Sequence, residues 1–213
     1  EWLKTERGIE PEDSRSIVLH LCNGACACAV LGRKSIDTSM GLTPLAGVVM
    51  GTRSGDVDPA IFSHLGRVAG LSVEEVETAL NRDSGMLGLC GVGDMRAVEE
   101  LIQSGDEAAK LAMDVYVHRI RSTVGAYIAT LGGIDAIAFT AGIGENSEPV
   151  RARVVAGLSG FSLSIDPERN HGRGADASGV REIYAPESAA ALLVIPTNEE
   201  LEIATQTLQA IGH

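Results

Sequence analysis

The sequence predicts an α/β domain built on one mixed β-sheet. Three observations lead to this fold class: strand-like runs joined by tight turns open the chain, a long helical pattern follows, and two short buried strands near the end each precede a helix. Strands joined by tight turns pair antiparallel, whereas strands separated by a helix pair parallel. Both kinds of pairing are therefore expected in one sheet.

The first two strands are expected at residues 16–22 and 25–31, on either side of Asn23-Gly24. An Asn-Gly pair between apolar runs is a strong hairpin signal, because both residues accept the positive φ of a type I′ turn. The tip has a second interpretation, a backbone nest whose N–H groups hold phosphate oxygens. The local sequence does not decide between the two. A second tight turn at residues 32–34 leads into a third strand over residues 35–39.

A long glycine-punctuated segment, residues 40–58, follows the third strand. Loops of this length are uncommon unless they are functional. Its strongly charged donor is Arg53, which has Gly51 and Gly55 close on either side. Arg53 is either a solvated loop arginine or a ligand contact, since small neighbouring residues let a ligand approach the backbone closely.

Helices are expected next. Asp58-Pro59 begins one that ends near Leu65, and a capping box from Ser72 to Glu75 begins another. The apolar stripe of the second helix is Val73, Val76 and Leu80. The glycine-rich segment 84–96 then brings Asp94, whose simplest role is to cap the following helix.

One long helix is predicted over residues 106–131, ended by Gly132-Gly133. Its buried face is expected to comprise Leu111, Val115, Val117, Ile120, Val124, Ile128 and Leu131. A short buried strand over residues 134–139 runs into a glycine-rich loop at 140–146, and Ser147 caps the next helix, which ends near residue 156. A strand, a glycine-rich loop and a helix in that order place N–H groups at an anion, although this loop matches neither a P-loop nor a dinucleotide fingerprint.

The last segments are a polar surface excursion at residues 166–186, a buried strand at 191–196, and a helix that reaches Ala210. A capping box from Thr197 to Glu200 assigns Glu200 to the backbone and leaves Glu199 free. Glu199 is then either a favourable charge on the helix dipole or a magnesium ligand. The whole order suits the ribonuclease-H-like type of α/β fold.

Composition limits the function classes. The formal net charge of −12 and the lack of a basic stripe exclude a nucleic-acid binder, and no apolar run is long enough to span a membrane. Four cysteines in 213 residues are too few for a disulfide scaffold, so a cytoplasmic setting is expected. The charged start of the chain lacks a signal-peptide core and an initiator Met, so we expect a processed or truncated chain.

Four segments together resemble the second half of the acetate kinase family. They are HLCNGA at 20–25, DTSMGLTPLAGVVMGTRSGDVDP at 37–59, FTAGIGENS at 139–147 and IPTNEEL at 195–201. Order and approximate spacing match over essentially all 213 residues, and MGTRSGD and GIGEN are specific to acetate, propionate and butyrate kinases. The resemblance implies the fold of the acetate and sugar kinase, heat-shock chaperone and actin superfamily.

The resemblance also implies an activity and a site. The family transfers the γ-phosphoryl group of ATP to a short carboxylate with Mg²⁺ or Mn²⁺, giving an acyl phosphate and ADP. Arg53 would stabilise the transferring phosphoryl group, Pro44 would line the acetate pocket, and Glu199 would serve the metal. The implied ATP contacts are His20, Leu21, Cys22, Asn23 and Gly24 for the phosphates, and Asp94, Met95, Arg96, Gly142, Ile143, Gly144, Glu145 and Asn146 for the adenosine.

The family's first domain has no counterpart here: its N-x-G-S-S-S-x-K segment, carboxylate-binding arginine, catalytic aspartate and active-site histidine are absent. We therefore expect residues 1–213 to be a C-terminal nucleotide-binding and dimerisation domain with little or no kinase activity alone. The family forms homodimers mainly through this half, and the helix over 106–131 is a candidate contact surface. The alternative is a non-catalytic nucleotide-binding or dimerisation module. A two-metal nuclease is disfavoured, because the opening strands carry only Asp37.

Cys22 departs from the family, which has glycine there. If that position needs a positive φ or a close phosphate, cysteine would lower affinity. His20, Cys22, Cys26 and Cys28 would allow a metal cluster across the hairpin, but their spacing is not a zinc pattern, and small buried thiols are the favoured interpretation.

Overall fold

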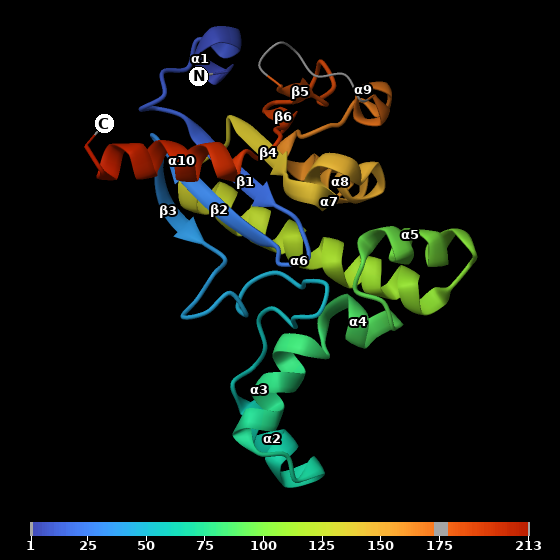
Figure 1. The fold of residues 1–213 in the computed structure, drawn as a ribbon. Helices are drawn as coiled ribbons and strands as arrows, with labels where there is room; N and C mark the ends of the chain where they lie inside the picture. The colour runs from blue at the N-terminus through green and yellow to red at the C-terminus, as the bar shows by residue number, and fades with distance from the viewer. Residues whose placement is uncertain (1, 173–178, 213) are drawn as a thin grey trace.

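The computed structural model describes residues 2–172 and 179–212 and contains one six-stranded sheet in the order β3-β2-β1-β4-β6-β5 (Figure 1). The pairs β1–β2, β2–β3 and β5–β6 are antiparallel, whereas β1–β4 and β4–β6 are parallel. The predicted mixed sheet is therefore confirmed. The strands are β1 (Arg15–His20), β2 (Cys26–Leu31), β3 (Lys34–Thr38), β4 (Ala136–Thr140), β5 (Arg181–Glu182) and β6 (Ala191–Val194).

The helix α6 is the centre of the core. It runs behind the sheet in Figure 1 and packs against β1 and β2. Asp106 caps its start by accepting a hydrogen bond from the Ala109 N–H, and Gly132 ends it in the left-handed conformation, as predicted. The α-helices are α1 (Trp2–Arg7), α2 (Ala60–Ala69), α3 (Val73–Arg82), α4 (Gly85–Cys90), α5 (Met95–Gln103), α6 (Glu107–Leu131), α7 (Ala141–Asn146), α8 (Glu148–Ala156), α9 (Pro167–His171) and α10 (Glu199–Ala210).

Buried and half-buried residues alternate along β1 and β2, which explains why α6 covers one face of the sheet. Ile17 and Leu19 of β1 and Ala27 and Ala29 of β2 are each at most 1% exposed, and they face the core. Most of the predicted face of α6 is buried within the same chain, but Leu111 is 59% exposed. One face of α6 is therefore used for internal packing, and its other face, which includes Leu111, stays a candidate surface for dimer contacts.

The predicted β1–β2 hairpin is confirmed, but its turn is not type I′. His20 pairs with Cys26, and neither Asn23 nor Gly24 has a positive φ. The connection is wider than a two-residue turn and spans residues 21–25, because Leu21 bonds outside the hairpin: its N–H donates to Thr140 O, and its carbonyl accepts from two N–H groups of α7. The positive φ values that a type I′ turn needs occur instead at Gly32 and Arg33, 53° and 64°, between β2 and β3.

Local capping signals were good guides to helix starts. The capping box at the start of α3 forms in both directions, and Asp94 and Ser147 cap α5 and α8. The Thr197 capping box is wrong, because Asn198 caps α10 instead by accepting from the Leu201 N–H. Val73 is 63% exposed, so it does not belong to the buried stripe of α3.

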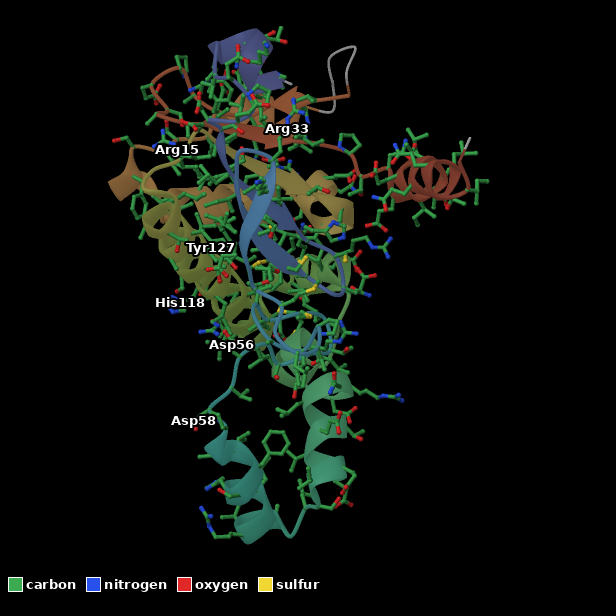
Figure 2. All side chains as sticks on the ribbon, turned by 90° about the vertical axis from the view of Figure 1, so that its left-hand side faces the viewer. Arg15, Arg33, Asp56, Asp58, His118 and Tyr127 are labelled. Atoms are coloured by element: carbon green, nitrogen blue, oxygen red, sulfur yellow. The ribbon has the colours of Figure 1, made fainter. Side chains whose placement is uncertain are left out.

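Several predicted loops contain regular structure. Residues 140–146 hold α7 rather than an open loop, residues 84–96 include α4, and residues 166–186 include α9 and β5. The long segment between β3 and α2 has no helix or strand, as predicted. The helices α2 and α3 pack against each other and stand clear of the sheet, with Asp58 at the entry to this arm (Figure 2). In the described part of the chain, no helix has the length and apolar character needed to cross a membrane.

Candidate functional site

Three loops that are distant in the sequence meet below the sheet through close backbone approach. The Gly51 N–H donates to Asn23 O at 3.1 Å. A Cβ on Gly51 would lie 2.8 Å from Gly93 O, and a Cβ on Gly24 would lie 3.1 Å from Arg53 Nη1. A side chain at Gly51 would therefore meet a backbone oxygen and separate the two loops, whereas a side chain at Gly24 would displace the Arg53 guanidinium.

Arg53 lies beside the tip of the β1–β2 connection. The residue is half-buried, and its Nη1 is 4.0 Å from Met50 Sδ. None of the ion pairs among the described residues involves Arg53. A half-buried arginine without a carboxylate partner is suited to an anionic ligand that approaches Gly24.

A cavity of about 520 Å³ opens between α5 and α7. This volume lies within the range of small-molecule sites in proteins, roughly 300–1,000 Å³. Its lining comprises Cys22, Asn23, Asp94, Met95, Arg96, Glu99, Gly142, Ile143, Asn146 and Ser147. All of these except Glu99 and Ser147 are sequence-predicted site residues, so the structure brings together segments from three regions of the chain.

The α5 wall is fixed by Asp94 and Arg96. Asp94 Oδ1 accepts hydrogen bonds from the Arg96 N–H and Nε at 2.9 and 3.0 Å, and Oδ2 lies 2.6 Å from Arg96 Nη2. The Arg96 guanidinium and N–H lower the pKa of Asp94 to about 2. The Asp94 carboxylate is therefore charged at neutral pH and has spare lone pairs to accept a hydroxyl.

The α7 wall begins with a sharp bend after β4, because Ala141 has a φ of 65°. The N–H groups of Ile143 and Gly144 both donate to Leu21 O, at 2.8 and 3.2 Å. These two donors are therefore already used and cannot hold an anion as the glycine-rich sequence had suggested. Gly144 is glycine for packing, since a Cβ there would lie 3.2 Å from the Phe139 carbonyl carbon.

A hydrogen bond between Ser147 Oγ and Glu99 Oε1 links the two walls. Ser147 is 6% exposed, and its Oγ also accepts from the Val150 N–H at the start of α8. The sequence indicated only a capping role for Ser147 and no role for Glu99. The available signal was spacing: Glu99 follows Met95 by four residues, so the two share one face of α5.

Cys22 fits its position without backbone strain, because its φ is not positive. Its thiol lies 3.1 Å from Gly24 O. All four cysteines are free and half-buried rather than fully buried. Among the described residues, no group of three or more His, Cys, Asp or Glu side chains forms a metal site, so a cluster across the hairpin is excluded there.

The predicted metal residue Glu199 lies at the start of α10, with Oε1 3.6 Å from His20 Nε2. Its side chain is 71% exposed. Mg²⁺ commonly binds through one or two carboxylates together with substrate phosphates and water. A single exposed carboxylate beside His20 fits a metal that a nucleotide brings with it, and does not fit an all-protein metal cage.

Other predicted residues lie outside the cavity. The Glu145 carboxylate binds the Thr197 N–H and Oγ1 at 3.0 and 3.1 Å. Leu21 is fully buried, and its backbone N–H and carbonyl already bond to Thr140 and to α7, so it is a structural residue rather than a phosphate contact. Pro44 is exposed on the loop between β3 and α2 and does not line the cavity.

The comparisons with known proteins agree on one family. A family profile described as the Acetokinase family matches residues 5–205. An acetate kinase of Streptomyces avermitilis is 55% identical over 206 residues, which are 96% of this chain and 50% of that protein. The crystal structure of Porphyromonas gingivalis acetate kinase superposes with a TM-score of 0.90 at 38% identity, covering 98% of this chain and 52% of that one. The crystal structure of a propionate kinase from Francisella tularensis superposes with a TM-score of 0.84 at 43% identity, covering 92% of this chain and 49% of that one. The chain spans about half the length of the curated relatives it matches.

Proposed function

The chain belongs to the acetokinase family, and on that premise we propose that it is the nucleotide-binding half of an acetate kinase. Such an enzyme moves the γ-phosphoryl group of ATP to acetate, reversibly, giving acetyl phosphate and ADP. The observation that carries the proposal is the cavity between α5 and α7: Asn23 lines it, and the neighbouring Gly24 lies against the guanidinium of Arg53, which forms no ion pair among the described residues. Relatives that match nearly the whole chain are named acetate kinases.

Each part of the site has a distinct task in this proposal. Adenosine occupies the cavity, where the Asp94 carboxylate accepts hydrogen bonds from ribose hydroxyls. The phosphates extend along the 22–24 connection toward Arg53, whose charge stabilises the transferring phosphoryl group. Phosphoryl transfer depends on positioning and charge neutralisation rather than on covalent protein chemistry, so these groups suit their tasks.

A divalent metal fits the proposal through the nucleotide. Mg²⁺ would neutralise the phosphate oxygens, and Glu199 would contact it directly or through water. His20 lies beside Glu199, so the predicted phosphate and metal residues share one region. The free thiols suit a reducing compartment such as the cytoplasm.

In this proposal the chain binds the nucleotide, and catalysis also needs the residues that the relatives carry in the half of their sequence that this chain does not match. We therefore propose that the 213-residue chain binds nucleotide but turns over slowly or not at all by itself. We also propose that the chain forms a homodimer with a second copy of itself. A nucleotide-binding or dimerisation module without catalysis is the alternative, and it shares the same cavity.

Two assays test the proposal. Calorimetric titration with Mg·ADP should show one binding site per chain, and an acetyl phosphate assay should show little product compared with a full-length relative such as the Streptomyces avermitilis protein. No binding heat at millimolar nucleotide would reject the half-site. Turnover near that of the full-length protein would reject the proposal that the chain needs the other half for catalysis.

A further inference from the structure

Arg151, on α8, is a buried cation whose hydrogen-bond partners are all uncharged. It is 2% exposed, and no ion pair among the described residues involves it. Nε and Nη2 donate to the side chain and backbone oxygens of Asn170, at 2.7 and 3.0 Å. Nη1 donates to Gly144 O and Glu145 O, at 2.9 and 3.0 Å. Burying a charged guanidinium without a carboxylate partner costs free energy, so the residue is unusual for a structural arginine.

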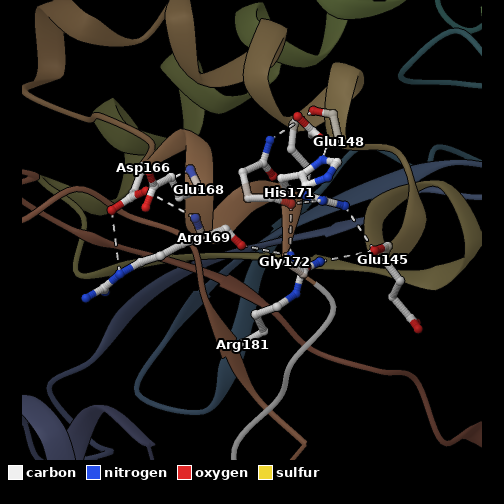
Figure 3. Close-up of polar contacts among 10 residues, drawn as sticks. Glu145, Glu148, Asp166, Glu168, Arg169, His171, Gly172 and Arg181 are labelled. Atoms are coloured by element: carbon white, nitrogen blue, oxygen red, sulfur yellow. Dashed lines mark hydrogen bonds and ion pairs between the residues drawn. The ribbon is translucent and has the colours of Figure 1, made fainter.

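A second guanidinium, that of Arg181, reaches two of these carbonyls, Asn170 O at 3.0 Å and Glu145 O at 3.4 Å. Arg181 lies on β5, and its Nη1 donates to Arg169 O at 3.1 Å. Nη1 also donates to Gly172 O (Figure 3). The carbonyl ends of α7 and α9 thus converge on two cations. Helix C-termini carry unpaired carbonyls and the negative end of the helix dipole, which accounts for cations held without a carboxylate.

The helix α7 needs support from outside, because it has only six residues. Its N-terminal turn is held by Leu21 O, which accepts from Ile143 and Gly144. Its C-terminal turn is held by Arg151 and Arg181. The residues of α7 that line the cavity, Gly142, Ile143 and Asn146, are themselves anchored or directly adjoin the anchored residues.

We propose that Arg151 is a positioning residue for nucleotide binding: it holds the carbonyl end of α7 and so sets the distance of the α7 wall from α5. The inference rests on the proposed nucleotide site. Arg151 does not act on the phosphates, since its donors are occupied by protein carbonyls. Burial lowers the pKa of Arg151 to about 10, so the side chain is still charged at neutral pH.

The test is Arg151→Lys, with Arg121→Lys as a matched control. Arg121, on α6, also donates to helix carbonyls, with Nε 3.1 Å from Arg153 O and 3.4 Å from Val154 O, but these belong to the end of α8. Lysine keeps the charge and loses the planar, multidentate donor. Arg151→Lys should weaken Mg·ADP binding on the order of tenfold, because a small displacement of a binding wall has large effects. Arg121→Lys should leave the affinity within about twofold, since its carbonyl partners lie away from the cavity.

Amide hydrogen exchange without nucleotide gives an independent readout. Arg151→Lys should accelerate exchange at Ile143 and Gly144 relative to α5, whereas Arg121→Lys should not. If the wild-type chain fails to bind Mg·ADP, the proposed function fails, and the exchange data still decide whether Arg151 holds α7. Unchanged affinity and unchanged α7 exchange in Arg151→Lys would overturn the inference, as would equal effects of both variants. If Arg151→Lys does not fold, Arg181→Lys should show a smaller effect of the same sign, and no effect would overturn the inference.

Discussion

The contact of Gly51 with Gly93 gives the sharpest prediction about how the loops form the site. A Cβ on Gly51 would lie 2.8 Å from Gly93 O, about 0.6 Å inside the 3.4 Å at which ordinary contact begins. Gly51 does not have a positive φ, so Gly51→Ala introduces this clash and no backbone strain of its own. The obstacle is a backbone oxygen, which cannot rotate away as a side chain would. The two loops must therefore separate.

Overpacking of this kind costs about 1–3 kcal/mol of unfolding free energy. For a chain of this size, roughly 2–4 °C of melting temperature corresponds to 1 kcal/mol, so Gly51→Ala should melt roughly 2–12 °C lower. Mg·ADP affinity should fall as well, because Asn23, which bonds to Gly51, lines the cavity.

The matched control is Gly125→Ala, inside α6, where a Cβ would meet nothing within 4 Å. This change should raise stability by up to about 1 kcal/mol, since alanine favours a helix over glycine. Thermal unfolding and calorimetry are done on both variants. If Gly51→Ala melts and binds like the wild type, the close approach of the loops is not real.

Three further changes test single interactions. Asp106→Ala should lower the unfolding free energy by about 1 kcal/mol in denaturant titrations, because it removes the cap on the Ala109 N–H, and an unchanged midpoint would contradict that cap. Arg96→Gln should raise the pKa of Asp94 from about 2 toward its ordinary value near 3.9, measured by NMR titration of the carboxyl carbon; no rise would mean that Arg96 is not the cause. Because the folded-state pKa is lowered, whatever stability this carboxylate contributes is complete above its ordinary pKa and is lost as the pH falls through about 2. Glu99→Ala should weaken Mg·ADP binding more than Glu99→Gln, which keeps an acceptor for Ser147, and equal losses would argue against the link between the walls.

Helix starts were the most predictable part of the fold. Ser72, Asp106 and Ser147 each bond to a backbone N–H within three residues, so the signal and the contact lie in the same short segment. The turn at Asn23-Gly24 was not predictable in this way. Its geometry depends on Leu21, which pairs with Thr140 and α7 more than a hundred residues away.

Glycine-rich sequence was an ambiguous signal in this chain. It predicted an open anion-binding loop at residues 140–146, where the structure has α7. Gly144 serves close packing against β4, whereas Gly51 and Gly93 serve the approach of two loops. The two roles differ in which atom a Cβ at each glycine would contact, and that atom is known only from the tertiary structure.

The resemblance to the acetate kinase family identified most of the residues that line the cavity. It did not identify Glu99, Arg151 or Arg181, which shape the site by holding its walls. Their partners are backbone carbonyls or a capping serine on other elements, so no short motif contains both members of a contact. Family motifs thus located the residues that line the cavity better than the residues that hold its walls.

An NMR titration of the ¹⁵N-labelled chain with Mg·ADP would locate the bound nucleotide on the protein. We expect the largest amide shifts in residues 22–24, 94–96 and 142–146, around the cavity between α5 and α7. Shifts concentrated on the α2–α3 arm, or no shifts at millimolar nucleotide, would contradict the proposed nucleotide site.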